Sequence, residues 1–202
     1  MPRSRRNIPP DSILHVINRG NDRRTLFRDA SEYEEFLGLL RHAAGREPLR
    51  LLGYVLMPNH WHLVVWPESG TQLSRYLHLV ATVHAARWRR RVGRTGEGHV
   101  YQDRYHAFMI ESERQFFNVL RYVEANPIRA GLVTRSVEWP WSSLAERLMG
   151  PAGLLTPSPF PLPPDWLDLV ELGLPSQVLA DLREHTRRAQ RTAAEPSLRG
   201  AR

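Results

Sequence analysis

The sequence contains no cysteine and no lysine. The lack of cysteine excludes disulfide bonds, thiolate zinc sites and cysteine nucleophiles, so any chemistry must use histidine, carboxylate, amide or hydroxyl groups. The sequence also lacks an uncharged apolar run of about 18 residues, the length needed to cross a membrane. Near its start, prolines and Asp11 stand where a signal peptide would need an apolar segment. We therefore expect a soluble, cytoplasmic protein with no membrane partner.

Positive charge dominates the ionisable residues. The chain carries 28 basic residues, all of them arginine, against 21 Asp and Glu, which gives a formal net charge of +7. Such an excess indicates a polyanionic partner such as nucleic acid. The densest group lies within 87–94 and contains no acid: Arg87, Arg89, Arg90, Arg91 and Arg94. We expect these side chains to contact phosphates. For any single arginine of the group, the alternative is a solvent-exposed side chain that binds no partner.

A length of 202 residues allows one complete core with an appendage. Seven of the sixteen prolines lie between 151 and 175. We therefore divide the chain into a main domain at 1–150, a proline-rich connector at 151–175, and a C-terminal helix with a basic tail at 176–202. The C-terminal segment either folds back across a functional groove or stays a loosely held solvated tail.

Hydrophobic periodicity and turn signals predict the order βαββαβα. Strands are expected at 13–17, 49–57, 61–66 and 105–110, and helices after Asp29 or Ser31, at 71–92 and at 113–125. This order predicts an α+β fold, a ferredoxin-like α/β sandwich in which one antiparallel sheet carries helices on one face. The segment 176–188 adds a C-terminal helical extension.

The strands expected at 49–57 and 61–66 are separated by a short turn and predict a hairpin. The tripeptide His60-Trp61-His62 lies in the second strand of this hairpin. Because side chains alternate along a strand, both imidazoles share one face and Trp61 takes the other. Two neighbouring histidines can hold one metal ion. The alternative is a polar pair on the open face of the sheet.

The helix at 113–125 contributes two further candidates. On a helical wheel Phe116, Leu120 and Val123 define the buried face, and Tyr122 falls roughly 140° from its centre. Tyr122 is therefore not an ordinary core tyrosine. Asn126 lies one turn further on the same flank, so a phenol and an amide project together. The alternatives are a packed surface tyrosine and an asparagine that ends the helix before Pro127.

The sequence resembles the single-tyrosine HUH transposases, and in particular the REP-associated tyrosine transposases. The resemblance runs in register from about residue 13 to 170. Its blocks are YVLMPNHWHLV at 54–64, GHVYQDRY at 98–105, RYVEANPIRAGLV at 121–133, WPWSS at 139–143 and PPDW at 163–166.

The resemblance implies a nuclease and strand transferase that acts on single-stranded DNA at REP-type hairpins. It assigns Tyr122 as the nucleophile that forms a 5′-phosphotyrosine, and His60, His62 and Asn126 as metal ligands. Mg²⁺ or Mn²⁺ is the expected ion, although two imidazoles and an amide would also accept zinc or nickel. DNA contacts are expected from Arg19, Arg87, Arg89, Arg90, Arg91, Arg104 and Arg129. The resemblance also implies a monomer associated with the nucleoid.

Two other functions fit parts of the sequence. A non-catalytic protein could bind a DNA hairpin with the same fold, although the intact set of Tyr122, His60, His62 and Asn126 argues against a decayed site. An RNA-binding sheet domain would place aromatic side chains on its open face, where this sequence puts histidines.

Overall fold

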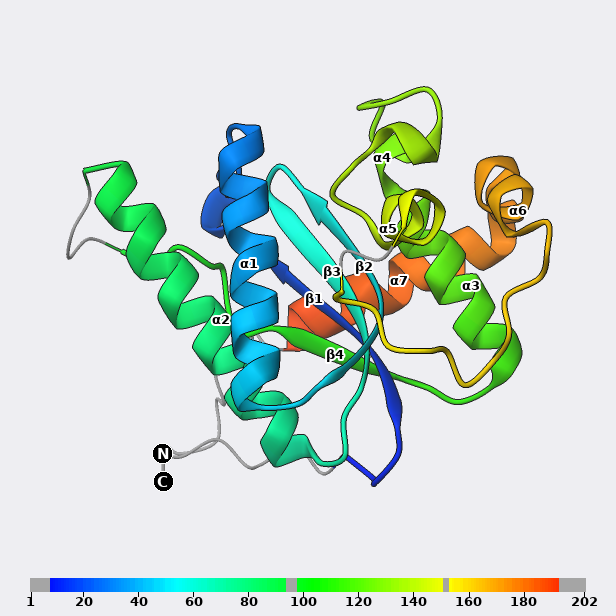
Figure 1. The fold of residues 1–202 in the computed structure, drawn as a ribbon, viewed down its shortest axis with the longest axis horizontal. Coiled ribbons are helices and arrows are strands. Elements are labelled where there is room, and N and C mark those ends of the chain that lie inside the picture. Colours follow the sequence, from blue (N-terminus) through cyan, green and yellow to red (C-terminus); the bar gives the residue numbers. More distant parts are fainter. Residues whose placement is uncertain (1–7, 94–97, 151–152, 193–202) are drawn as a thin grey trace, which may run out of the picture.

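The computed structural model describes residues 8–93, 98–150 and 153–192, and it is built on a four-stranded antiparallel sheet (Figure 1). The strand order is β2-β3-β1-β4, and the strands are β1 (Ile13–Arg19), β2 (Arg50–Met57), β3 (His60–Trp66) and β4 (His106–Ile110). The core elements follow the order βαββαβα along the chain. The predicted ferredoxin-like arrangement is confirmed.

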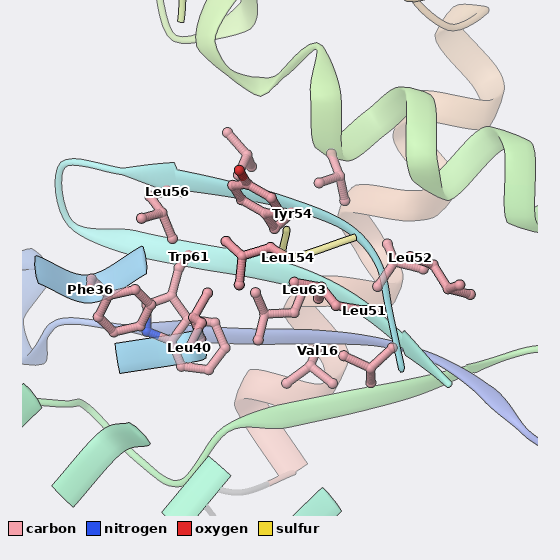
Figure 2. Close-up of a cluster of buried hydrophobic side chains, with 14 of the residues drawn as sticks. Val16, Phe36, Leu40, Leu51, Leu52, Tyr54, Leu56, Trp61, Leu63 and Leu154 are labelled. Atoms are coloured by element: carbon pink, nitrogen blue, oxygen red, sulfur yellow. The ribbon is translucent and has the colours of Figure 1, made fainter. Parts of the chain in front are cut away.

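Two long helices cover one face of this sheet: α1 (Ala30–Arg46) and α2 (Gly70–Arg91) (Figure 1). Asp29 caps α1 by accepting from the Glu32 amide, and Ser69 caps α2 by accepting from the Gln72 amide. Figure 2 shows the apolar layer beneath α1, where Phe36 and Leu40 face Trp61, Leu63 and Val16. Burial of these side chains is the main force that holds the helices on the sheet.

The opposite face of the sheet is also covered, which corrects the expectation of helices on one face only. Helix α3 (Glu113–Glu124) lies on this face, α5 (Ser143–Met149) packs against β2, and α6 (Trp166–Leu172) and α7 (Ser176–Thr192) pack against α3 (Figure 1). Gly53 of β2 makes the close approach of α3 possible, because a Cβ there would lie 2.3 Å from a methyl group of Leu120. The sheet therefore separates two helical layers.

Three short helices complete the fold, namely η1 (Asn21–Arg23), α4 (Asn126–Arg129) and η2 (Ser136–Glu138). The described part of the connector lies along the body, since Thr156 donates its amide to the Leu51 carbonyl at 2.8 Å. Trp166 is buried, so this part of the connector packs against the rest of the fold. Across the described ranges no helix is long and apolar enough to span a bilayer.

One buried carboxylate joins three helices of the second layer. Glu124, at the end of α3, is fully buried and accepts a hydrogen bond from Ser143 of α5 at 2.5 Å. Trp166 of α6 donates its indole N–H to the other oxygen at 2.7 Å, and Arg147 of α5 pairs with the carboxylate at 3.2 Å. This network fixes the position of the C-terminal end of α3.

Replacing Glu124 by alanine should destabilise the protein by roughly 3–5 kcal/mol, because Arg147 and the Trp166 indole would lose their shared buried partner. The measurement is urea unfolding followed by circular dichroism. Glu113→Ala, at the exposed start of the same helix, is the control and should cost less than about 1 kcal/mol. Equal midpoints for the two variants would contradict the role given to Glu124.

Candidate active site

Two histidines of β3 lie side by side on the sheet face that α3 covers. The ring centroids of His60 and His62 are 5.1 Å apart and the rings are nearly perpendicular, at 77°. Trp61, between them, is completely buried in the layer under α1. The alternation predicted from the tripeptide is therefore present in the structure.

The Nδ1 atoms of both imidazoles are engaged in hydrogen bonds. His60 Nδ1 lies 2.6 Å from Asn59 Oδ1, and His62 Nδ1 lies 2.8 Å from Nε2 of His15 on β1. An amide oxygen only accepts, so His60 must donate from Nδ1. If His62 donates to His15 in the same way, both Nε2 atoms keep a free lone pair, which is the arrangement that metal-binding histidines use.

All three imidazoles are held in the neutral form. Burial lowers the pKa of His15 to about 4. Burial, with smaller effects from the charges of Arg19 and Arg129, lowers the pKa of His60 to about 3. Burial, followed by the neighbouring His15, shifts the pKa of His62 well below its usual range. Only a neutral imidazole can bind a metal, so the site favours the ligand form.

Tyr122 of α3 reaches this cluster from the helical layer. Its ring lies 5.9 Å from the His62 ring and 6.2 Å from the His15 ring, edge-on to both. Phe116 and Leu120 of the same helix are completely buried, and Tyr122 is itself buried, with 8% of its surface exposed, so the helical wheel was wrong to set it apart from the buried residues. The predicted nucleophile and the predicted histidines therefore meet at one place.

Two predicted DNA-binding arginines also belong to the cluster. Arg19 of β1 stands directly opposite His60 in the strand register. The Arg129 guanidinium carbon lies 4.2 Å from the centroid of the Tyr122 ring. Neither side chain forms an ion pair with an acid among the residues that the structure describes. The site is therefore positively charged.

Asn126 begins α4, which continues almost directly from α3 one turn beyond Tyr122. Its side chain is buried, and its Nδ2 atom has no hydrogen-bond partner within the described ranges. No group of three histidine or carboxylate side chains suited to a metal occurs in those ranges. A metal site here therefore needs the Asn126 amide beside the two histidines, and such a donor set fits a divalent ion. The assignment of His60, His62 and Asn126 as ligands stays a prediction.

The arginines at the end of α2 lie on the other helical layer and are partly neutralised. Arg87 pairs with Glu35 of α1 at 3.1 Å, and Arg91 pairs with both Glu35 and Glu32. Arg89 donates to the Gly98 carbonyl at 3.0 Å. Four of the predicted DNA contacts are exposed, namely Arg87, Arg90, Arg91 and Arg104, and of these Arg90 and Arg104 form no ion pair with another described residue. Arg94 lies outside the described residues. The role of this group in binding DNA stays a prediction.

Helix α7 packs beside the candidate site. Leu182 and Thr186 line a small pocket together with His15, Phe108 and Val119. This part of the C-terminal segment is therefore docked, not loosely solvated. Its control of access to the site stays a prediction, and the tail 193–202 lies outside the described residues.

His15 and Asn59 contact the predicted ligands but were not singled out from the sequence. Asn59 directly precedes His60 in the sequence, so its adjacency was the signal that could have identified it. The histidine falls on the correct face of its own strand, yet only the register that sets Ile17 opposite His62 brings it to the site.

Comparison with known families identifies the chain. Residues 10–126, more than half of the sequence, match the family model described as "Transposase IS200 like". This protein belongs to the IS200-like transposase family. The transposase is thus an enzyme of the DNA-transposing kind. No curated protein matches its sequence.

Two solved structures are similar to this transposase. A REP-associated tyrosine transposase bound to a REP hairpin is similar over 77% of this chain and 89% of its own, with a TM-score of 0.55 and 18% identity. A protein of Deinococcus radiodurans R1 described as a transposase is also 18% identical, covering 61% of this chain and 96% of its own with a TM-score of 0.42. The first of these confirms the fold.

If His60 and His62 bind a metal ion as predicted, removing the hydrogen-bond acceptor behind His62 should weaken that binding. His15→Phe keeps a flat ring but cannot accept from His62 Nδ1, and loss of such a partner typically costs 10–100-fold in affinity. Mn²⁺ titration followed by electron paramagnetic resonance measures the change. His42→Phe, at an exposed position of α1, is the control. If both variants bind Mn²⁺ as tightly as the wild type, His15 does not orient His62.

Proposed function

We propose that this transposase is a metal-dependent endonuclease and strand transferase for single-stranded DNA, with Tyr122 as its nucleophile. The observation that supports this proposal is the meeting of Tyr122 with two neutral histidines and two arginines without acidic partners. A phenol, a pair of metal-binding imidazoles and unneutralised positive charge are the groups that cleavage of a phosphodiester requires.

The proposed reaction exchanges one phosphoester for another. The Tyr122 oxygen attacks the phosphorus and loses its proton, and the bond from phosphorus to the 3′-oxygen breaks. The 3′-oxygen leaves, takes up a proton, and becomes a free hydroxyl, while the 5′-phosphate stays attached to Tyr122. Attack by another 3′-hydroxyl on this 5′-phosphotyrosine rejoins DNA and releases the phenol. No ATP is needed, because the covalent link conserves the phosphodiester.

Three residues would hold the divalent ion, namely His60, His62 and Asn126. When bound, Mg²⁺ or Mn²⁺ supplies positive charge that polarises the phosphate and stabilises the charge of the transition state. His15 and Asn59 keep the two imidazoles oriented through their Nδ1 atoms. Burial keeps those imidazoles neutral, and the packing of α3 on the sheet brings the phenol to them.

The proposed substrate is a REP-type DNA hairpin with an adjoining single strand, bound by one copy of the protein. The structural relative of this fold is itself bound to a REP hairpin. The net charge of +7, carried only by arginine on the basic side, suits a folded polyanion. Arg90 and Arg104 are exposed and remain the better candidates for contacts away from the site.

Tyr122→Phe removes only the phenolic oxygen. Cleavage and covalent adduct should therefore vanish together, while hairpin affinity and stability stay close to those of the wild type. A labelled hairpin with a single-stranded flank, incubated with Mn²⁺ and resolved on a denaturing gel, shows the adduct as an SDS-resistant band. Wild-type protein that binds the hairpin but forms no adduct would favour the non-catalytic binding function. Cleavage by the variant at the wild-type rate would show that another group attacks.

Replacing either His60 or His62 by alanine should abolish cleavage at any practical metal concentration, because each supplies one of few ligands. Asn126→Ala should weaken metal affinity less, and EDTA should stop cleavage while leaving most hairpin binding intact. Cleavage rates across a Mn²⁺ titration measure these effects, with the exposed His78→Ala as the control. A double histidine variant that still cleaves in EDTA would exclude metal-dependent cleavage.

A further inference from the structure

Arg19 and Arg129 have buried guanidinium nitrogens that the fold leaves without a partner. Arg147, in contrast, pairs with Glu124 at 3.2 Å, and Arg121 donates to the Leu169 carbonyl at 2.9 Å. At the candidate site, Nε of Arg19 and Nη2 of Arg129 are buried without a hydrogen-bond partner in the described part of the chain. Such unpaired donors carry a cost that a bound anion would remove.

The two guanidinium groups reach the same reacting groups from different elements. Arg19 comes from β1 and Arg129 from α4, and the charges of both act on His60 and on Tyr122. Burial lowers the pKa of Arg129, an effect that the neighbouring Tyr122 partly offsets. Arginine stays protonated in proteins. The centre therefore carries at least two positive charges before any metal binds.

Stacking on Tyr122 does not by itself account for Arg129. One side-chain hydrogen bond joins Arg129 to Tyr122, but Nη2 of Arg129 has no partner in the described ranges. A cation over an aromatic ring is attracted by the face of the ring, and this attraction uses none of the N–H donors in the guanidinium plane. Those donors form a planar fork that matches two oxygens of a phosphate. An anion with tetrahedral oxygens can therefore use what the stacking leaves free.

We propose that Arg19 and Arg129 together bind the phosphate that Tyr122 attacks. This inference rests on the proposed function, since a phosphodiester of single-stranded DNA is the intended ligand. A phosphate that contacts both guanidinium groups lies beside Tyr122 and His60, where the bond to phosphorus forms. The pair then neutralises charge on the non-bridging oxygens, and this charge increases in the transition state.

The first test uses inorganic phosphate, in EDTA, with no DNA and no turnover. Titration followed through the Nε–Hε NMR signals of the arginines should show one saturable site that shifts Arg19 and Arg129. Arg19→Gln and Arg129→Gln should each weaken this site at least tenfold. Arg114→Gln, at the exposed far end of α3, should leave it unchanged. If no saturable site exists, or if Arg114→Gln weakens it equally, the proposal is overturned.

Folding of the variants is checked by thermal unfolding. Arg19→Lys and Arg129→Lys keep the charge but lose the fork, so each should retain phosphate binding that is weaker than wild type and stronger than that of its Gln counterpart. Lysine variants that unfold like the wild type and bind no better than the Gln variants would indicate that charge at these positions is irrelevant, which contradicts the proposal.

The second test asks whether the bound phosphate is the scissile one. Sequencing the DNA end attached to Tyr122 in the wild-type adduct locates the cleaved linkage, which is then replaced by an uncharged methylphosphonate. In the Tyr122→Phe background, the charged linkage should bind at least tenfold more tightly than the methylphosphonate, and Arg129→Gln should abolish this preference. An unchanged preference in Arg129→Gln would overturn the assignment to the scissile phosphate. If the wild type forms no adduct, the proposed function fails. The phosphate titration then still decides whether Arg19 and Arg129 together bind a phosphate.

Discussion

The buried carboxylate of Glu124 determines where the Tyr122 phenol lies. It gathers a hydroxyl from α5, an indole from α6 and a guanidinium from α5 around the last turn of α3. Tyr122 stands two residues earlier on that helix, so the same network that anchors α3 also sets the approach of the phenol to the sheet. The histidines come from the sheet and the tyrosine from the helical layer, and their juxtaposition depends on this anchor.

Charge pairing does not extend to the candidate site. On the α1 and α2 side, Glu32 and Glu35 neutralise arginines of α2. On the α3 side, Arg19 and Arg129 have no acidic partner among the described residues, and the imidazoles beside them are neutral. The overall excess of arginine is therefore less informative than the place where acids are missing. That place coincides with Tyr122, which is the strongest physical reason to expect a phosphate there.

Local patterns predicted the parts of the structure that depend on neighbours in sequence. The order of the elements and the shared face of His60 and His62 follow from strand and helix periodicity. The burial of Tyr122 did not follow from the helical wheel, because α3 is covered on more than one side. The second helical layer was not predicted, because it depends on the close approach that Gly53 allows. His15 was missed for a similar reason, since 47 residues separate it from His62 and only strand register joins them. The pairing of Arg91 with Glu35 likewise spans 56 residues.

The two histidines of the candidate site lie on β3, which belongs to the most cooperative part of the fold. β3 is paired on both sides, with β2 and with β1, so its backbone amides are protected until the sheet itself opens. Its turn to β2 consists of only Pro58 and Asn59, which leaves no flexible loop to reshape the site. We therefore expect a substitution at a buried position of β3 to lower the stability of the sheet and to displace the two histidines at the same time.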